Sequence, residues 1–231
     1  MAEHPYNEKY YAGSCNKNGV PYDRSVPQWL EFFRSLAGHI ALKIAPRTTF
    51  EIGCAKGFLV ESLRDLGVQA EGIDISEYAI SQVRPDIKPF CRVSSAGQFS
   101  PSLKHYDLVI SIEVIEHLAP EQGRLAIGRM CELSDTVLVS STSDDFEEPT
   151  HINVQPNRYW RDLFAENGFA EDPRFNFKKT IGKDAMLFRR KTGWTGSWLK
   201  MQARKPFCAA FYSSIVRRAA AKLRGGACAD K

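Results

Sequence analysis

Hydrophobic residues recur at three- and four-residue steps between residues 25 and 46, and this spacing predicts one amphipathic helix. Ser25 and Pro27 resemble an N-cap and a first-turn proline, and Pro46 ends the helical pattern. The first 25 residues are polar and aromatic with glycine and proline among them, so we expect an irregular lead-in before the helix. The apolar positions of the helix are Trp29, Phe32, Phe33, Leu36, Ile40 and Ile44.

Beyond Pro46 the pattern changes to short apolar or β-branched runs that alternate with helical segments. This alternation predicts an α/β fold with a mainly parallel sheet covered on both faces. The expected strands are residues 48–52, 70–73, 90–93, 106–112, 136–140, 169–177 (extended) and 185–189. The expected helices are residues 57–66, a short helix capped by Ser76, residues 123–133 and residues 156–167.

The 231-residue chain has the composition of an ordinary globular protein, with 43% hydrophobic and 25% charged residues. This composition excludes a disordered tail protein, a collagen-like fibre and a disulfide-rich miniprotein. The six cysteines are spread singly, without the paired spacing of a zinc site or a disulfide framework. With no leader pattern and no long apolar run, we expect a cytoplasmic protein with free thiols.

Charge is divided unevenly along the chain. Residues 1–177 carry 17 Lys and Arg against 25 Asp and Glu, a net charge of −8. Residues 178–231 carry 14 basic residues against 2 acidic ones, a net charge of +12. A basic tail on an acidic body indicates an anionic partner such as a membrane surface, a nucleic acid or a polyanionic glycan, unless the tail is merely solvated.

A glycine turn, Glu51-Ile52-Gly53-Cys54-Ala55-Lys56-Gly57, directly follows a predicted strand and opens a helix. Glycine there lets the backbone approach a ligand closely, and the helix N-terminus offers unpaired N–H groups. The spacing is G-x-x-x-G, which lacks the G-x-G-x-x-G pattern of a pyrophosphate-binding loop. Taken alone, a glycine turn between a strand and a helix only reverses the chain about as often as it binds a ligand.

Two further segments place polar groups at the carboxyl ends of predicted strands. Asp74 ends the second strand, where a carboxylate can accept both hydroxyls of a ribose, although it could also merely help Ser76 begin a helix. Glu113, Glu116 and His117 follow the strand that starts at Tyr106. Open α/β sheets bind ligands at this edge.

Together these segments resemble the class I S-adenosylmethionine-dependent methyltransferases, most nearly the ubiquinone-biosynthesis-like and related small-molecule O-methyltransferases. The likeness covers about residues 48–190 and rests on E-x-G-x-x-x-G, G-x-D-x-S and D-L-V-x-S-x-E-V-x-E-H-L, in that order. It implies a Rossmann-like, doubly wound, seven-stranded and mainly parallel sheet with an antiparallel last hairpin. We expect residues 48–191 to form this domain, residues 1–47 to cap its acceptor side, and residues 192–231 to form a basic amphipathic extension.

The resemblance also implies the cofactor, S-adenosyl-L-methionine, and the residues that hold it. Gly53 and its neighbours would lie under the methionine part, Asp74 would bind the ribose, and Ile75 would cover the adenine. The chain departs from the family after the third strand, where an adenine-binding Asp is replaced by Ser94-Ser95-Ala96. The implied cofactor residues are Glu51, Gly53, Cys54, Ala55, Gly57, Phe58, Asp74, Ile75, Ser95, Ala96, Ile112 and Glu113.

Charge agrees with this cofactor, because a sulfonium cation suits an acidic pocket better than a pyrophosphate would. Transfer to an alcohol needs a group that takes the acceptor's proton. We favour His151 as that base, with Asn153 and flanking acids to orient it, although a loop histidine is often only a structural hydrogen-bonder. His117 is expected to tether its loop or line the acceptor pocket.

Two other features leave alternatives open. An acidic run, Asp144, Asp145, Glu147 and Glu148, has the oxygen ligands that Mg²⁺ prefers, but such runs are usually solvated loops and we expect no metal. The tail from Trp194 to Arg224 combines aromatic and basic residues at helical spacing. This pattern is typical of a helix that lies on an anionic membrane and also of a helix packed on the core.

We therefore interpret the chain as an S-adenosylmethionine-dependent methyltransferase that acts on an oxygen of a small-molecule or glycan acceptor. The alternatives are N- or C-methylation, a nucleic-acid methyltransferase and a non-catalytic cofactor-binding scaffold. A nucleic-acid substrate is disfavoured because no base-methylation motif is present. A nicotinamide oxidoreductase is disfavoured by the glycine spacing.

Overall fold

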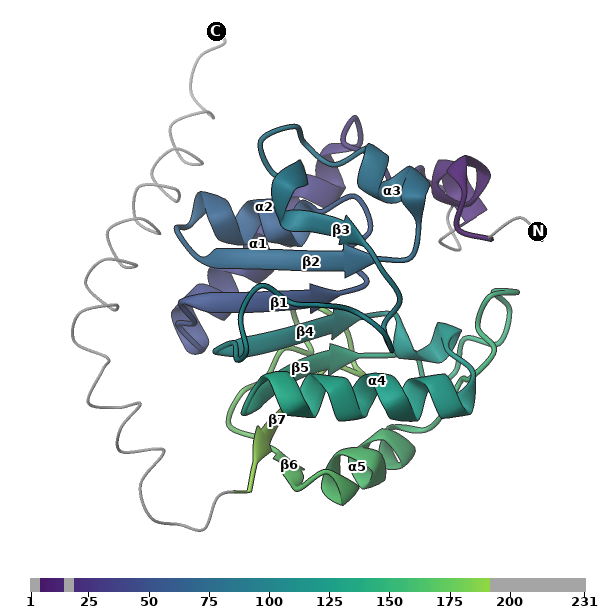
Figure 1. Cartoon of the computed structure of the whole chain (residues 1–231). Coiled ribbons are helices and arrows are strands. Elements are labelled where there is room, and N and C mark those ends of the chain that lie inside the picture. Colours follow the sequence, from purple (N-terminus) through teal and green to yellow (C-terminus); the bar gives the residue numbers. More distant parts are fainter. Residues whose placement is uncertain (1–4, 15–18, 192–231) are drawn as a thin grey trace, which may run out of the picture.

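Seven strands form one sheet at the centre of the computed structural model, which describes residues 5–14 and 19–191 (Figure 1). The strand order is β3-β2-β1-β4-β5-β7-β6. Strands β1 to β5 pair in parallel and β7 runs antiparallel to both β5 and β6, which confirms the Rossmann-like sheet with its last antiparallel hairpin. The strands are β1 (Thr48–Ile52), β2 (Gln69–Asp74), β3 (Cys91–Val93), β4 (Leu108–Ile112), β5 (Thr136–Ser140), β6 (Phe169–Glu171) and β7 (Met186–Arg190).

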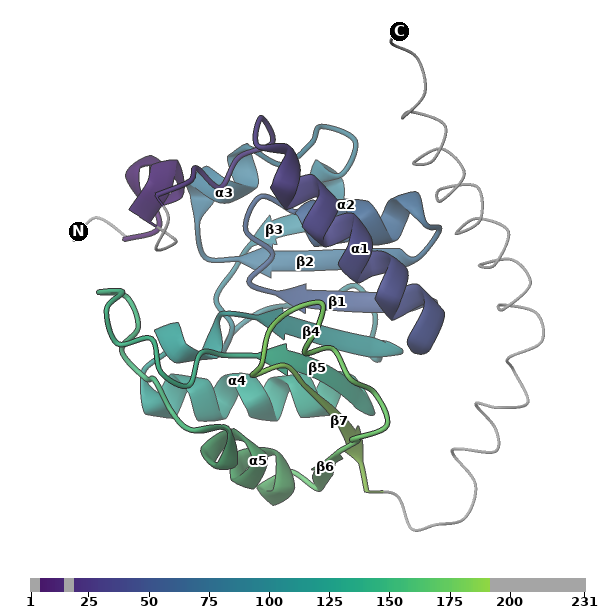
Figure 2. The ribbon, with the colours of Figure 1, turned by 180° about the vertical axis from the view of Figure 1, so that it is seen from behind.

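Helices cover both faces of this sheet (Figures 1 and 2). Helices α1 and α2 pack on one face, and α4 and α5 on the other. The apolar strands supply both layers because side chains alternate along a strand: Leu108 and Ile110 face α1 and α2, whereas Val109 faces α4 and α5. The helices are α1 (Pro27–Lys43), α2 (Phe58–Asp65), α3 (Glu77–Ser81), α4 (Pro120–Leu133) and α5 (Asn157–Glu166), with short turns η1 (Tyr10–Ser14), η2 (Lys88–Phe90) and η3 (Ile115–His117).

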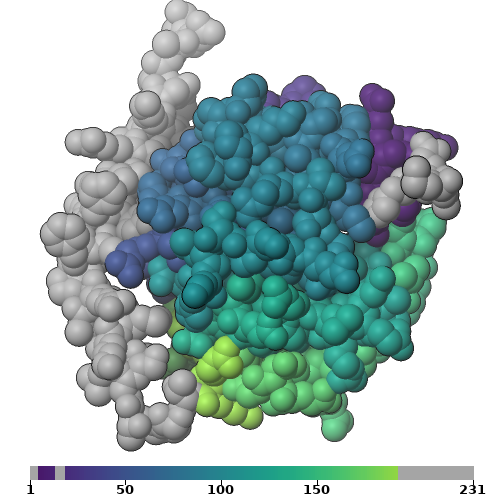
Figure 3. All heavy atoms as spheres, in the orientation of Figure 1, coloured from purple at the N-terminus to yellow at the C-terminus, as the bar shows by residue number. Residues whose placement is uncertain are grey.

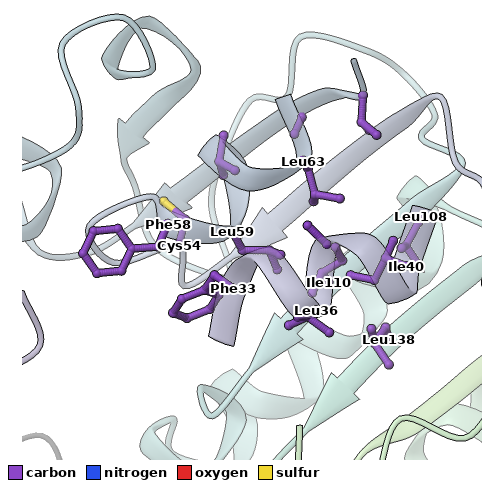
Figure 4. Close-up of a cluster of buried hydrophobic side chains, with 14 of the residues drawn as sticks. Phe33, Leu36, Ile40, Cys54, Phe58, Leu59, Leu63, Leu108, Ile110 and Leu138 are labelled. Carbon is purple, nitrogen blue, oxygen red and sulfur yellow. The ribbon is translucent and has the colours of Figure 1, made fainter. Parts of the chain in front are cut away.

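The core on the α1 side joins the N-terminal helix to the sheet (Figure 4). Leu36 and Ile40 of α1 are fully buried against Leu59 and Leu63 of α2 and against Ile110 of β4. The apolar spacing predicted for α1 therefore faces inward, as expected of an amphipathic helix. Since α1 shares a core with α2, β2 and β4, it anchors the N-terminal segment that precedes it.

Some element ends are shifted by one to three residues: α4 begins at Pro120 rather than Gly123, and β4 at Leu108 rather than Tyr106. The structure differs further from the sequence predictions at three places. The lead-in is not wholly irregular, because Tyr10–Ser14 forms the helical turn η1. Ser25 does not cap α1: the N-cap is Val26, and the Ser25 hydroxyl instead donates to Asp23. The extended segment 169–177 pairs only over Phe169–Glu171, because Pro173 follows closely and cannot donate to a strand ladder.

Ser76 caps α3 as predicted, since its hydroxyl oxygen accepts from the Ala79 backbone N–H at 3.0 Å. The basic extension 192–231, and with it the predicted amphipathic helix, lies outside the described residues. Within the part of the chain that is described, no helix has both the length and the apolar character needed to cross a membrane.

Candidate functional site

A cavity of about 900 Å³ lies beyond the carboxyl ends of β1, β2 and β4. Strand β1 has β2 on one side and β4 on the other, so the chain reverses its winding direction here. This switch point is where open α/β sheets bind their ligands, and the volume falls in the range of small-molecule sites. The cavity therefore lies where the glycine turn, Asp74 and the Glu113–His117 segment were expected to meet.

The glycine turn forms the floor of the cavity. The backbone N–H groups of Gly53 and Cys54 both donate to the Ile73 carbonyl at 2.8 Å, which folds the turn against β2. Gly53 has φ +80°, and a Cβ at this position would lie 2.2 Å from Cγ2 of Val114. Glycine is thus required at position 53 both by conformation and by space.

A second glycine shapes the same floor from the neighbouring strand. Gly72 of β2 faces Cys54, and a Cβ added at Gly72 would lie 2.6 Å from the Cys54 Cβ and 2.9 Å from its sulfur. The Cys54 side chain is buried in this gap while its residue lines the cavity. The glycine turn can therefore approach β2 only because position 72 has no side chain.

Asp74 lies at the cavity wall in a fixed orientation. One carboxylate oxygen accepts from the Ala55 backbone N–H and the other from the Ser76 backbone N–H, each at 2.8 Å. The two donors belong to the glycine turn and to the start of α3. Such backbone donors stabilise the ionised carboxylate and hold it in one rotamer, so it can meet a ligand without reorganisation.

Glu51 is the buried acid of the cavity. Burial raises the pKa of Glu51 well above its usual range, and the charge of Asp74 adds to the effect. Its Oε2 has no hydrogen-bond partner among residues 5–14 and 19–191. A buried carboxylate without a partner is costly, and a cationic ligand group would relieve that cost.

The charge of the lining favours a cationic ligand as a whole. Of the described residues that line the cavity, none is Lys or Arg. Its acidic residues are Glu51, Asp74, Glu113, Asp145 and Glu148. A sulfonium cofactor with an ammonium group fits this wall, whereas a pyrophosphate would be repelled.

One end of the cavity is suited to a flat base. Ile75 lines it with 43% of its surface exposed, and Ser95 and Ala96 lie in the same wall. The Ser94 hydroxyl donates to the Gln98 carbonyl at 2.8 Å, which closes a tight turn after β3. Gln98 also lines the cavity and offers an amide there, and no motif in the sequence pointed to it.

Two of the implied cofactor residues do not reach the cavity. Phe58 packs in the α1-side core against Tyr22, with ring centroids 5.1 Å apart. Gly57 is the N-cap of α2 and lies beside Cys91 and Val83. Both residues support the glycine turn from below. The other ten implied cofactor residues all line the cavity.

At the opposite end the structure brings His117 and His151 together. Their ring centroids are 4.6 Å apart, although 33 residues separate them in the chain. The Nδ1 of His117 lies 3.1 Å from the Thr150 carbonyl, and the Nδ1 of His151 lies 2.8 Å from the Asp145 carbonyl. A carbonyl oxygen only accepts, so each Nδ1 carries a hydrogen, and a neutral His117 ring keeps its lone pair on Nε2.

Burial and the neighbouring His151 lower the pKa of His117 to about 4. His117 is therefore neutral at physiological pH. The Nε2 of His151 lies 3.2 Å from Oε2 of Glu148, so both nitrogens of this ring face acceptor oxygens. Glu148 is one of the flanking acids predicted to orient His151. The side chain of Asn153, predicted to orient His151, instead accepts from the Gln155 amide at 3.1 Å, and its Nδ2 has no partner within the described residues.

Glu116 completes the cluster. It is fully buried, and its Oε1 accepts from the Thr142 backbone N–H at 3.2 Å. Its Oε2 has no partner within the described residues, and burial together with nearby Glu113 raises the pKa of Glu116 well above its usual range. One ligand atom each from Glu116, His117 and His151 lie within 4.8 Å of one another.

This donor set is chemically suited to a divalent cation. Two imidazoles oriented through Nδ1–H donors and one carboxylate are common ligands of transition metals. The acidic run considered from the sequence is a different group. Asp144 pairs with Lys183 at the surface, and only Asp145 and Glu148 of that run line the cavity.

Glu113 lies between the two ends of the cavity in a strained conformation. Its φ is +52°, unusual for a residue with a side chain. Its carboxylate accepts from the Ser140 hydroxyl at 2.7 Å, and its N–H donates to the Ser140 carbonyl at 3.1 Å. Strain of this kind persists where a loop must place a side chain for function.

The remaining wall comes from the lead-in and α1, the segment that the sequence predicts to cap the acceptor side. We call residues 5–14 and 19–24 the N-terminal strap. The strap and α1 supply seven aromatic side chains to the cavity, and only the density of tyrosines in the sequence could have signalled this. These residues are Tyr6, Tyr10, Tyr11, Tyr22, Trp29, Phe32 and Phe33.

Comparison with known proteins gives a consistent result. The family model described as a methyltransferase domain matches residues 22–171, which is more than half of the chain. Among curated proteins, the chain is similar to the ubiquinone biosynthesis O-methyltransferase of Burkholderia vietnamiensis (strain G4 / LMG 22486), with 31% identity over 104 residues. The match covers 41% of this chain, and the chain spans only 40% of the length of that relative.

Solved structures show the same fold. The magnesium protoporphyrin IX methyltransferase of Synechocystis PCC 6803 with bound S-adenosylmethionine has 18% identity and a TM-score of 0.56, and the match covers 79% of this chain and 88% of that one. The sugar N-methyltransferase of Streptoalloteichus sp. ATCC 53650 has 11% identity and a TM-score of 0.55, over 71% of this chain and 87% of that one. At these identities the likeness concerns the fold.

Proposed function

We propose that this chain, which belongs to the methyltransferase-domain family and is an S-adenosylmethionine-dependent methyltransferase, methylates an oxygen of a small-molecule acceptor. The observation that carries the oxygen assignment is the Glu116–His117–His151 cluster, whose two histidines line the cavity while Glu116 is buried behind them. A hydroxyl must lose a proton as it accepts a methyl group, and this cluster is suited to that task.

The cofactor end uses residues that already point into the cavity. S-adenosylmethionine supplies an electrophilic methyl group on its sulfonium sulfur. Asp74 is oriented to accept the ribose hydroxyls, and Glu51 offers an ionisable carboxylate to the ammonium group. Ile75 and the turn at Ser95 and Ala96 form the walls for the adenine.

The acceptor end is aromatic on one side and polar on the other. Tyr6, Trp29 and Phe32 offer ring faces that can stack on a planar phenol or on the apolar face of a sugar. The acceptor hydroxyl would then meet Nε2 of His117, beside the His151 ring that Glu148 orients. Holding this oxygen in line with the methyl group and sulfur is the main catalytic contribution expected of the protein.

The same cluster favours a divalent cation as an aid to this reaction. The unpartnered Oε2 of buried Glu116 is the specific observation, since a cation would satisfy it. A bound cation would lower the pKa of the acceptor hydroxyl. Glu116, His117 and His151 would hold it, and Glu113 and Glu148 lie close enough to the cluster to add negative charge.

The acceptor class is tested with methyl-labelled S-adenosylmethionine and a panel of phenols, glycosides and matched amines. We expect a methyl ether from a hydroxyl acceptor, identified by NMR of the labelled carbon. Labelled N-methyl products with unreactive hydroxyl analogues would overturn the oxygen assignment and leave the methyltransferase assignment intact.

Roles within the cluster are tested by substitution and by chelation. His151→Ala and His117→Ala are each expected to lower turnover by roughly 10²–10⁴ while the affinity for S-adenosylmethionine stays within a few-fold. If a cation is used, EDTA abolishes turnover and Mg²⁺ or Mn²⁺ restores it in the native protein but not in Glu116→Gln. Full activity in EDTA would assign proton removal to the histidines alone.

A further inference from the structure

Polar links hold the N-terminal strap over the cavity, and four of them join it to the two sides of the site. Asp23 pairs with the buried Lys56 of the glycine turn at 3.0 Å, and Arg24 pairs with Glu61 of α2. The Tyr6 carbonyl accepts from the Ser76 hydroxyl at 2.6 Å, directly after the Asp74 strand. Three of the partners therefore lie on the cofactor side of the site, in or next to its loops.

The fourth link crosses to the other side. The Tyr10 hydroxyl donates to Oε1 of Glu148 at 2.8 Å, between residues 138 positions apart. Figure 3 shows the purple strap beside the green segment that follows β5, and Figure 1 shows η1 above the same loop. The strap thus bridges the cofactor loops and the loop that carries His151.

Glu148 connects this link to the proposed reacting cluster. Its Oε1 also accepts from the Thr150 hydroxyl at 2.6 Å, so two hydroxyl donors fix the rotation of the carboxylate. The other oxygen, Oε2, is thereby turned toward Nε2 of His151 at 3.2 Å. One donor is local to the loop, and the other arrives with the strap.

Packing alone would not require this hydroxyl. The Tyr10 ring is already held by edge-to-face contacts with Tyr6 and Tyr11, at centroid distances of 5.0 and 5.2 Å. Phenylalanine would keep both ring contacts. The hydroxyl makes a hydrogen bond that reaches the opposite loop.

We propose that Tyr10 is a positioning residue that acts through Glu148 on His151, so that the acceptor end of the site is complete only when the strap is docked on the cofactor loops. The proposal rests on the proposed function, because it assigns Tyr10 a role in transfer to the acceptor. It makes the strap a part of the catalytic apparatus as well as a wall of the cavity.

The first experiment needs no acceptor. Hydrogen–deuterium exchange of the full chain saturated with S-adenosylhomocysteine is compared for the native protein, Tyr10→Phe, and Tyr159→Phe as a matched control on α5. In Tyr10→Phe we expect about tenfold faster exchange at backbone amides of residues 148–153, where the His151 N–H donates to the Glu148 carbonyl at 3.0 Å. Tyr159→Phe is expected to match the native protein.

The second experiment separates positioning from stability through kinetics with whichever acceptor the panel identifies. Tyr10→Phe is expected to lower kcat about three- to tenfold, with affinity for S-adenosylhomocysteine within twofold of native. Glu148→Gln should lower kcat further, and Tyr10→Phe in the Glu148→Gln background should add less than twofold, because both changes remove one interaction.

Two results would overturn the proposal: native exchange at residues 148–153 in Tyr10→Phe, or kcat effects of the two substitutions that simply multiply. Failure of the proposed function can be told apart from failure of this proposal. The first appears as an absence of O-methyl product, whereas the exchange experiment needs no acceptor and is unaffected by it. Circular dichroism of each variant verifies that it is folded before either result is used.

Discussion

At the scale of single residues, Asp74 and Glu51 show how one cavity uses two carboxylates differently. Asp74 is surrounded by backbone donors that stabilise its charge. Glu51 is buried with one oxygen unpartnered, so its charge is unfavourable until a cation arrives. The first is prepared to accept hydrogen bonds, and the second becomes fully effective only in the complex.

Replacing Asp74 with alanine is expected to weaken S-adenosylhomocysteine binding by about 1.5–3 kcal/mol, the range for hydrogen bonds to a charged group. Isothermal titration calorimetry measures this directly. Asp162→Ala on the exposed surface of α5 serves as the control and should bind as the native protein does. An unchanged affinity in Asp74→Ala would mean that the ribose lies elsewhere in the cavity.

Glu51→Gln is expected to stabilise the ligand-free protein while weakening cofactor binding. Because the pKa of Glu51 is raised in the folded state, the folded protein keeps a proton that the unfolded chain releases above about pH 4.5. Unfolding then releases a proton, so the native free energy of unfolding decreases as pH rises from this point. The glutamine variant lacks this decrease.

Urea unfolding at several values between about pH 5 and pH 8 compares the two proteins. We expect Glu51→Gln to be on the order of 1–2 kcal/mol more stable at the upper end, with the gap closing at the lower end. Parallel curves for the two proteins would show that Glu51 is already paired in the free state. Isothermal titration calorimetry on the same samples measures whether Glu51→Gln weakens cofactor binding.

The sequence placed residues at the cavity where a motif determines the geometry. Gly53, Asp74 and His117 line the cavity as expected, because their spacing relative to strand ends is local. The contact between Tyr10 and Glu148 was not predicted, because it spans 138 positions and no local pattern encodes it. The unpartnered oxygen of Glu116 is likewise a property of burial, which follows only from the packed fold.

At the scale of elements, α1 ties the aromatic wall of the site to the core. Leu36→Ala should lower the free energy of unfolding by about 2–5 kcal/mol, because Leu36 is fully buried between α2 and the sheet. Leu42→Ala on the same helix is the matched control, since Leu42 is 67% exposed and its loss should cost less than about 0.5 kcal/mol. Urea unfolding of both variants makes the comparison, and equal losses would contradict the packing described.

Element boundaries followed from the sequence wherever an apolar run was framed by turn residues. The strand at residues 48–52 and the strand at residues 136–140 were predicted to the residue, because both are buried and β-branched. The strand that begins at Phe169 was predicted too long. The aromatic residues after it suggested a strand, but such residues also pack in loops. Phe177 is buried, yet it belongs to no strand.

At the scale of the whole molecule, the division of charge remains to be explained. The body carries a net charge of −8 up to residue 177, and the rest of the chain carries +12. We propose that the segment from about Trp194 to Arg224 holds the enzyme on an anionic membrane surface. Each basic residue near such a surface contributes about 1 kcal/mol, and salt weakens the attraction.

This proposal is tested by co-sedimentation with anionic and neutral vesicles. The full chain is compared with a chain that ends at Lys191. We expect only the full chain to sediment, only with anionic vesicles, and less at high salt. Equal sedimentation of both chains, or a shortened chain that no longer folds, would assign the segment to the core instead.

The gap between Gly72 and Cys54 has a consequence for how this protein can vary. A side chain at position 72 would enter the space that the cysteine fills, so the two positions are not independent choices. A substitution at either one is acceptable only in the context of the other, and a library that randomises them separately will discard viable pairs. The space beneath the cofactor therefore depends on both residues at once. An engineer who wishes to reshape this part of the cavity must redesign positions 54 and 72 together.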